Sequence, residues 1–313
     1  MGKDYRVLVT GSNGFVGNAL CNELRANDFG VLGSIRDESK AICGQENLVV
    51  NTLNANTDWR FALEGRDTVV HLAGRAHVLN DTAENKLDSF RLTNTAASLN
   101  LAEQAADCGV SRFIFLSSIG VNGAVTSGVP FKSDDVPLPH TPYAISKLEA
   151  EIGLQLIAKR TNMEVVIIRS PAVYGKSAPG NFGLIEQFIK YNIPLPLGSI
   201  NNKRSLVCIQ NLVSFIALCI VNDKAANRLF LVSDNEDLST PEIVELMGRL
   251  VKKAPKLIQF PLKPLWFIFN LIGKQKAAQS LMTDLQLDIS CTRELLGWNP
   301  PFDPRSSIEQ ETE

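Results

Sequence analysis

The stretch VLVTGSNGFVGNAL, residues 7–20, decides the fold because it joins an apolar strand to a glycine-rich turn and the start of a helix. Gly11, Gly14 and Gly17 follow the strand directly. Glycines in this setting permit a tight turn, a close approach of the backbone to a bound pyrophosphate, and close packing of the helix on the strand. The N–H groups and the positive dipole of the helix start add to the attraction for an anion. The stretch therefore predicts a dinucleotide-binding turn.

Short apolar runs rich in β-branched residues alternate with longer helical patterns as far as about residue 174. These runs lack polar alternation, so each is expected to be a strand buried on both faces of a parallel sheet. A long helix is predicted from about Leu87 to Cys108, just before Gly109. The predicted fold class is α/β, with a Rossmann-type doubly wound parallel sheet. The predicted strands cover residues 5–10, 29–35, 47–50, 67–73, 112–118 and 164–170.

After about residue 175 the pattern loosens into loops that contain Pro and Gly, short helices and isolated strands. We predict a dinucleotide-binding domain over residues 1–174, to which a return segment at about 204–233 also belongs. Residues 175–313 are predicted to form mainly a smaller, interleaved substrate-binding domain. Ligands of open α/β sheets bind beyond the carboxyl ends of the strands. The cleft between the two domains is therefore the expected site.

The bulk composition argues against several classes of protein. The 313 residues include 31 basic and 33 acidic ones without a block of like charges, so no nucleic-acid surface is expected. The six cysteines form no CxxC pair and have no histidine at ligand spacing, which predicts reduced thiols and no metal site. The N-terminus lacks the features of a signal peptide, and we expect a cytoplasmic protein.

Two stretches are apolar enough to raise the question of a membrane. They are LVSFIALCIV (212–221) and PLKPLWFIFNLIG (261–273). Both fall short of the roughly 20 residues that a spanning helix needs, so no transmembrane segment is predicted. The first is predicted to be a core helix. The second is predicted to be a helix packed on its own domain, with an in-plane contact with a membrane surface as the alternative.

The end of the second predicted strand, GSIRDES, bears on the kind of dinucleotide. An acidic residue about 20 positions after the glycines grips the ribose 2′-hydroxyl of NAD, whereas an arginine there accommodates the 2′-phosphate of NADP. That register falls near Ile35, which is followed by Arg36 and Asp37. If Arg36 faces the ribose, its planar guanidinium suits a phosphate. If Arg36 is a solvated charge, Asp37 does the usual work with NAD. We predict NADP, with NAD as the alternative.

The motif PYAISK, residues 142–147, places Tyr143 and Lys147 one helical turn apart. A Thr-Pro pair just before Tyr143 predicts a helix start, so the two side chains share a face near its N-terminus. The fifth predicted strand ends at Ser118, at the edge where substrate is expected. A nearby ammonium and a helix N-terminus favour the phenolate and are expected to lower the pKa of Tyr143. Ser118, Tyr143 and Lys147 can then move a proton while a nicotinamide moves a hydride.

Six motifs in order carry a resemblance to a known family. They are GSNGFVG (11–17), HLAG (71–74), LSS (116–118), PYAISK (142–147), VYG (173–175) and LLGWNP (295–300). In this combination, and over essentially its whole length, the chain resembles the extended short-chain dehydrogenase/reductase family. Within that family it is similar to the branch of nucleotide-sugar epimerases and 4-keto reductases.

The resemblance implies roles for particular residues. Ser118 and Tyr143 are implied to activate the substrate, with Tyr143 as the acid and base, and Lys147 is implied to tune Tyr143 and hold the nicotinamide ribose. The expected cofactor contacts are Gly11, Asn13, Gly14, Phe15, Val16, Gly17, Arg36, Leu72, Ala73, Gly74, Asn94, Tyr143 and Lys147. The expected substrate contacts are Ser118, Asn181 and Arg204. Arg204 is implied to hold the nucleotide diphosphate, although without the family context it also fits a plain surface charge.

Two reactions of this branch use the same residues. A 4-epimerase oxidises carbon 4 of the sugar, reduces it from the other face and keeps its cofactor, whereas a 4-reductase takes fresh NADPH. The runs PLPLGSINNKRSLV (194–207) and LSTPEIVELMGRL (238–250) are similar to those of bacterial 4-reductases that complete 6-deoxy-N-acetylhexosamine nucleotides for surface polysaccharide. Together with Arg36, they favour a UDP-4-keto-6-deoxy-N-acetylhexosamine 4-reductase. The alternative is a UDP-hexose or UDP-N-acetylhexosamine 4-epimerase.

Other features narrow the prediction further. Dehydratases of this branch carry an acidic pair directly after the active-site hydroxyl residue, but the stretch SSIGVNG (117–123) has no acid, which argues against loss of water. Where the family often has an acidic adenine contact, the chain reads NTLNANTD (51–58), so the adenine contacts stay open. A less favoured alternative is a non-catalytic dinucleotide sensor built on the same fold, because such a protein has no need of Ser118, Tyr143 and Lys147. Relatives often pair through two helices each, which implies a homodimer.

Overall fold

The computed structural model describes residues 5–41, 46–76 and 85–304. Within these residues a seven-stranded sheet has the order β10-β6-β5-β4-β1-β2-β3, and every neighbouring pair is parallel. The predicted α/β class and the six predicted strands are confirmed, and β10 joins them from the C-terminal half of the chain. The strands are β1 (Arg6–Thr10), β2 (Gly30–Ile35), β3 (Asn47–Val49), β4 (Thr68–His71), β5 (Arg112–Ser118), β6 (Glu164–Ser170) and β10 (Arg228–Leu231).

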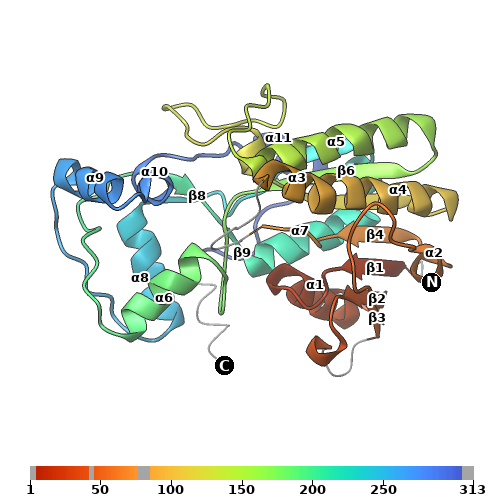
Figure 1. Cartoon of the computed structure of the whole chain (residues 1–313), viewed down its shortest axis with the longest axis horizontal. Helices are drawn as coiled ribbons and strands as arrows, with labels where there is room; N and C mark the ends of the chain where they lie inside the picture. The colour runs from red at the N-terminus through yellow and green to blue at the C-terminus, as the bar shows by residue number, and fades with distance from the viewer. Residues whose placement is uncertain (1–4, 42–45, 77–84, 305–313) are drawn as a thin grey trace.

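Side chains of the strands alternate between two apolar layers, one on each face of the sheet. Val7 and Val9 of β1 pack into one layer, whereas Leu8 packs into the other. Figure 1 shows helices on both sides of the sheet. Because both faces are covered, the strands lack polar alternation in the sequence. The first layer contains α1 (Phe15–Ala26) and α7 (Ile209–Val221), and the second contains α2 (Arg60–Leu63), α4 (Ala97–Asp107) and α5 (Pro142–Arg160).

A third apolar cluster lies in the C-terminal half of the chain. Its helices gather at the end of the molecule away from β1, β2 and β3 (Figure 1). They are α6 (Asn181–Lys190), α8 (Thr240–Leu250), α9 (Leu262–Leu271) and α10 (Gln275–Met282). Two short strand pairs adjoin them: parallel β7 (Val173–Tyr174) with β9 (Val207–Cys208), and antiparallel β8 (Arg204–Ser205) with β11 (Asp237–Leu238). The division into domains near residue 174 stays a prediction.

The remaining elements are short. They are α3 (Lys86–Phe90), α11 (Ser290–Leu296), the 3₁₀ turns η1 (Glu38–Lys40), η3 (Ile119–Val121) and η4 (Asp223–Ala225), and the π-helical turn η2 (Arg91–Ala96). The turn η2 connects α3 to α4 without a break, so the long helix predicted from Leu87 to Cys108 forms, with a π turn at its middle. The π turn coincides with Asn94, whose side chain is fully buried. Buried polar contacts of this side chain outweigh regular helical pairing, and π turns of this kind are frequent at functional sites.

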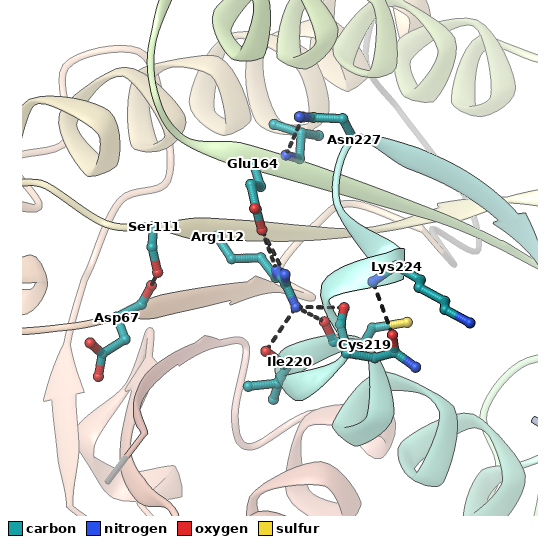
Figure 2. Close-up of polar contacts among 10 residues, drawn as sticks. Asp67, Ser111, Arg112, Glu164, Cys219, Ile220, Lys224 and Asn227 are labelled. Carbon is teal, nitrogen blue, oxygen red and sulfur yellow. Dashed lines mark hydrogen bonds and ion pairs between the residues drawn. The ribbon is translucent and has the colours of Figure 1, made fainter. Parts of the chain in front are cut away.

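Arg112, the first residue of β5, ties the sheet to the end of α7 (Figure 2). Its guanidinium pairs at 2.6 Å with Glu164, the first residue of β6 and its register partner. Its Nη1 also donates to the carbonyl oxygens of Cys219, Ile220 and Asn222 at 2.7, 2.9 and 3.1 Å. The last carbonyls of a helix lack partners within the helix. Arg112 therefore links the amino-terminal edge of the sheet to the C-terminal end of α7.

The two strongly apolar stretches have different surroundings. Helix α7 is buried along most of its length, as predicted for a core helix. Helix α9 buries Leu265 alone among its ten residues. Its other large apolar side chains are at least partly exposed, which a helix fully packed on its own domain does not explain. Over the described ranges, no helix has the length and hydropathy to cross a membrane.

Candidate active site

The glycine-rich turn is packed so tightly that side chains would collide at two of its positions. Gly11 has a φ of +69°, in the left-handed region, and an added Cβ would lie 3.1 Å from the backbone of Ala73. At Gly17 an added Cβ would lie 2.1 Å from the carbonyl oxygen of Gly11. Gly14 caps α1 without a side-chain hydrogen bond, and the first turn of α1 contains no acidic residue. The N–H groups at this helix start are not capped by a side chain, and they fit a pyrophosphate.

Asn13, Phe15 and Val16, which the sequence assigns to the cofactor, are half-buried around the same turn. The Phe15 side chain packs against both the first apolar layer of the sheet and the C-terminal cluster. The start of α1 therefore lies where the sheet meets the C-terminal helices. This is the setting in which open α/β sheets bind their ligands.

The end of β2 lies against the glycine turn. The N–H of Gly11 donates to the carbonyl oxygen of Ser34 at 3.0 Å. Arg36, just beyond the strand, is exposed. Asp37 caps η1, and its Oδ1 accepts from the N–H and the hydroxyl of Ser39 at 3.0 and 2.7 Å. Arg36 is thus exposed to solvent just beyond β2, while one carboxylate oxygen of Asp37 accepts hydrogen bonds within η1.

A directed chain of hydrogen bonds anchors the loop after β4 to β1. Thr10 Oγ1 accepts from the N–H groups of Leu72 and Ala73, both at 3.2 Å. Its own hydrogen is then left to donate to His71 Nδ1 at 2.7 Å. This arrangement makes Nε2 the protonated ring nitrogen, which donates to Ser98 Oγ at 2.8 Å. Burial lowers the pKa of His71 to about 3, so the imidazole is neutral in this chain.

Asn94 joins the loop after β4 to the first turn of α5. Its Oδ1 accepts from the N–H of Arg75 at 2.7 Å, and its Nδ2 donates to the Arg75 carbonyl at 3.0 Å and to Ser146 Oγ at 3.1 Å. Ser146 Oγ in turn donates to the carbonyl oxygen of Tyr143 at 2.8 Å. An added Cβ on Gly74 would lie 3.1 Å from Asn94 Oδ1. Asn94 therefore fixes both the loop and the backbone that carries Tyr143.

Ser118 and Tyr143, two of the three predicted catalytic residues, lie close enough for the Ser118 hydroxyl to act on the Tyr143 phenol. Ser118 is the last residue of β5, and Tyr143 lies in the first turn of α5, which Thr141 caps as predicted. The ring of Phe90 meets the Tyr143 ring edge-on at 6.0 Å between centroids. Burial raises the pKa of Tyr143 to about 12, although the Ser118 hydroxyl acts in the opposite direction.

Lys147 lies one turn after Tyr143, and its Nζ donates to the carbonyl oxygen of Leu116 at 2.9 Å. The ammonium also lies 4.3 Å from the centroid of the Phe115 ring, within the range of a cation–π interaction. Burial lowers the pKa of Lys147 to about 8, against the charge of Glu151, which raises it. The expected lowering of the Tyr143 pKa is therefore wrong for the chain by itself, because desolvation of the phenol outweighs the groups that favour the phenolate.

A buried ion pair lies one turn farther along α5. Glu151 pairs with Arg169 near the end of β6 at 2.6 Å, and both side chains are almost fully buried. The Ser117 hydroxyl donates to the same carboxylate, and Arg169 Nη1 donates to Asn122 Oδ1 at 2.8 Å. The carboxylate of Glu151 on α5 thus contacts both β5 and β6. Its charge also raises the pKa of Lys147.

The predicted substrate contacts Asn181 and Arg204 lie outside this cluster. Asn181 is the exposed first residue of α6. Arg204 is half-buried in β8, and its Nη1 donates to the carbonyl oxygen of Thr283 at 2.9 Å. Burial lowers the pKa of Arg204, with the charge of Asp284 opposing the shift. These positions are described, but the roles of both residues toward substrate stay predictions.

The sequence motifs did not point to His71, Glu151 or Arg169. A spacing signal existed for Glu151, because residues 143, 147 and 151 follow one another at intervals of four along the same helical face. A signal also existed for His71, which stands directly after a buried strand and needs polar partners there. Arg169 gave no local signal, since its partner lies on a neighbouring helix. In the ranges that the structure covers, no group of three His, Cys, Asp or Glu side chains could hold a metal ion.

Comparisons with known proteins give a family match, relatives in sequence and a similar fold. Residues 7–232 match the model of the NAD dependent epimerase/dehydratase family. A UDP-glucose 4-epimerase of Vibrio cholerae is 43% identical over 309 residues, which cover 97% of this chain and 93% of the relative. A dTDP-4-dehydro-6-deoxyglucose reductase of Escherichia coli is 27% identical over 320 residues, covering 94% of this chain and 92% of the relative. The fold is similar to that of MoeE5 in complex with UDP-glucuronic acid and NAD, with a TM-score of 0.79, 20% identity and 98% of both chains covered.

Proposed function

This chain belongs to the NAD dependent epimerase/dehydratase family, and from that premise we propose that it is a 4-epimerase of UDP-hexoses or UDP-N-acetylhexosamines. The observation that carries the proposal is that Ser118 ends β5 at the same carboxyl edge of the sheet as the glycine turn, with Tyr143 and Lys147 beside it at the start of α5. The 43% identity with a UDP-glucose 4-epimerase supports epimerisation ahead of the reductase activity that the sequence motifs favoured.

The chain offers a place for each end of a dinucleotide. In the proposal, the N–H groups at the start of α1 bind the pyrophosphate, since Gly11, Gly14 and Gly17 leave that helix start open. Lys147 binds the nicotinamide ribose through its ammonium. The loop after β4, which includes Gly74, covers the cofactor and is held in position by Asn94. The chemistry that NAD would supply when bound is the acceptance of a hydride from carbon 4 of the sugar and its return to the same carbon.

Tyr143 moves the proton in this scheme. It takes the proton of the C4 hydroxyl as that carbon is oxidised, and it returns a proton to the same oxygen after the 4-keto sugar has turned its other face. A phenol with a pKa of about 12 is protonated at neutral pH, so the acid form needs no assistance. The base form needs a lower phenol pKa, and the Ser118 hydroxyl acts in that direction. The single hydroxyl hydrogen of Ser118 can instead be donated to the substrate oxygen.

The substrate diphosphate is assigned to Arg204. One of its N–H groups is engaged by the Thr283 carbonyl, and a guanidinium has five N–H donors, so others are left for phosphate oxygens. Asn181, exposed at the start of α6, is assigned to the sugar. Loss of water from the sugar is not proposed, because no acidic residue follows Ser118 in the stretch SSIGVNG.

The proposal is tested by incubating the purified chain with UDP-glucose, and separately with UDP-N-acetylglucosamine, without added cofactor. We expect the corresponding galactose epimer to form in at least one incubation, resolved by anion-exchange chromatography and NMR. The Tyr143→Phe variant is the negative control. If neither sugar is converted even after NAD is supplied, the 4-epimerase proposal fails.

A second candidate function is the 4-reductase, which one observation favours. Arg36 is exposed just beyond β2, where an arginine suits the 2′-phosphate of NADP, and Asp37 is partly engaged in capping η1. The chain is also 27% identical to a 4-dehydro-sugar reductase. Incubation with a UDP-4-keto-6-deoxy-N-acetylhexosamine and NADPH tests this candidate through the loss of NADPH absorbance. Conversion of the unmodified sugars without added cofactor argues against it.

We also propose that the chain forms a homodimer through α5. Ile152 and Leu156 of α5 are 50% and 57% exposed, although other apolar side chains of this helix, such as Leu154 and Ile157, are buried. Apolar side chains one turn apart on a helix surface suit a contact with another helix. Analytical ultracentrifugation of the chain and of an Ile152→Lys, Leu156→Lys variant tests this assembly. A monomeric parent chain would exclude it.

A further inference from the structure

Helix α9 lies at the end of the molecule away from β1, β2 and β3 (Figure 1). Its large apolar side chains are exposed to solvent. Phe267 and Leu271 are 67% and 76% exposed. Because they lie four residues apart, they point the same way from the helix surface. Trp266 and Ile268 flank them and are also exposed. The exposed apolar set of this segment, called the α9 face below, consists of Leu262, Trp266, Phe267, Ile268, Leu271 and Ile272.

The segment of sequence that contains α9 carries charge of one sign. Residues 246–275 contain six basic residues and no acidic residue, although the whole chain carries a formal net charge of −2. Lys263 precedes Phe267 by one turn and Lys274 follows Leu271 by three residues, so the apolar row has an exposed lysine at each end. The six basic residues are Arg249, Lys252, Lys253, Lys256, Lys263 and Lys274.

We propose that the α9 face docks in the plane of a membrane surface that contains anionic lipids. Trp, Phe and Leu side chains on one side of a short helix enter the boundary between headgroups and acyl chains, and flanking lysines bind the headgroup phosphates. The long lysine side chains can keep their ammonium groups among the headgroups while their stems lie along apolar surface. The helix lies on the membrane in this arrangement and does not cross it.

The charge pattern decides between a membrane and a second copy of the chain. A symmetric contact between two copies through the α9 face would place the same basic segment of each copy against the other. Such like charges repel, whereas an anionic surface attracts Lys263 and Lys274, the exposed lysines at the two ends of the apolar row. The occupant that satisfies both the apolar row and the surrounding charge is therefore a lipid surface.

The chain contains its own probe of this contact. Of its three tryptophans, Trp59 and Trp298 are buried in the core, and Trp266 lies on the α9 face. A tryptophan that moves from water into the headgroup boundary shifts its fluorescence to shorter wavelength. The emission change on addition of lipid therefore reports on Trp266.

The test mixes the purified full chain with vesicles of phosphatidylethanolamine and phosphatidylglycerol, and separately with vesicles of phosphatidylcholine. We expect the chain to float with the anionic vesicles, to shift its tryptophan emission to shorter wavelength, and to lose at least tenfold in bound fraction at high salt or on neutral vesicles. The Phe267→Glu variant is expected to lose at least tenfold in binding. Trp266→Phe is expected to keep most of the binding and to lose the emission shift.

The matched control is Phe61→Glu, because Phe61 on α2 is 81% exposed but belongs to the other end of the molecule. This variant should bind anionic vesicles as the parent chain does. The proposal is overturned if the parent chain does not float with anionic vesicles, or if Phe61→Glu and Phe267→Glu reduce flotation equally. It is also overturned if the parent chain self-associates in sedimentation and Phe267→Glu abolishes that association, since the α9 face would then bind a second copy.

Discussion

Strands β5 and β6 run side by side, and each end of this strand pair carries a buried arginine that is paired with a glutamate. At the amino end, Arg112 pairs with Glu164 and donates to three carbonyl oxygens at the end of α7. At the carboxyl end, Arg169 pairs with Glu151, whose charge acts on Lys147 one turn away along α5. The first pair holds the end of α7 against the sheet. The second pair also contributes to the electrostatic field at the amine of Lys147.

The difference shows that the role of a buried ion pair depends on the groups that contact it. The neighbours of the amino-end pair are backbone carbonyls, which do not titrate and bind no ligand there. The neighbours of the carboxyl-end pair include Ser117, next to Ser118, and Lys147, next to Tyr143 along one helical face. Substitutions at the two ends should therefore separate stability from catalysis.

The largest expected effect is that of Tyr143→Phe. Removing the phenol hydroxyl removes the group that moves the proton, so kcat should fall about a thousandfold, as for other losses of a general acid and base. The midpoint of urea unfolding should stay close to that of the parent chain, because the ring keeps its packing against Phe90. Epimerase assays and urea titrations check the two parts. A kcat within tenfold of the parent would assign the proton transfer to another group.

The next effect is that of Arg112→Met, which should lower the free energy of unfolding by about 3 kcal/mol. Three carbonyl oxygens lose their donor, and the amino edge of the sheet loses its link to α7. The kcat per folded molecule should stay within twofold of the parent, as a rough bound for a site away from the reacting groups. Glu164→Gln is the matched control, since Glu164 is 37% exposed and its loss should cost less than about 1 kcal/mol. A large fall in kcat for Arg112→Met would mean that the two ends are coupled.

The smallest effect concerns pH and uses a pair of variants at the carboxyl end. Lys147 loses its proton as pH rises through about 8, so kcat/KM should fall on the alkaline side near that value if the ammonium is needed. Glu151→Gln removes the negative charge that raises the Lys147 pKa, so the alkaline limb should move to lower pH by about one unit. Arg169→Met leaves the Glu151 carboxylate without its counter-charge, so the limb should move to higher pH.

Both variants lose the same ion pair, so a general loss of stability would affect them alike. Profiles of kcat/KM against pH, measured where urea titrations show each variant to be folded, check the opposite shifts. Shifts in the same direction would mean that the charge of Glu151 does not act through Lys147.

The sequence predicted those parts of the molecule that depend on local pattern. The glycine turn, the six strands, the capped start of α5 and the identity of α7 as a core helix follow from spacing and burial along the chain. The π turn at Asn94 did not follow, because it depends on contacts with the loop after β4 and with Ser146, which are far away in sequence. The pairing of Arg169 with Glu151 likewise depends on packing between a strand and a helix.

The pKa of Tyr143 was predicted in the wrong direction for a related reason. The favourable partners, a helix start and Lys147, are visible in the motif PYAISK, whereas the burial of the phenol depends on the whole fold. The cofactor and the sugar depend on side chains at the ends of separate elements, such as Arg36 after β2 and Arg204 on β8. Motifs therefore predicted the class of chemistry more sharply than the substrate.

The most direct test of the central claim, that the Ser118, Tyr143 and Lys147 cluster serves 4-epimerisation, follows the hydrogen on carbon 4 of the sugar. UDP-glucose that carries deuterium at C4 is incubated with the chain without added cofactor, and the product is analysed by NMR and mass spectrometry. We expect UDP-galactose that retains the deuterium at C4, because the hydride leaves and returns to the same carbon. Loss of the deuterium to solvent, or turnover only when NADPH and a 4-keto sugar are supplied, would contradict the claim.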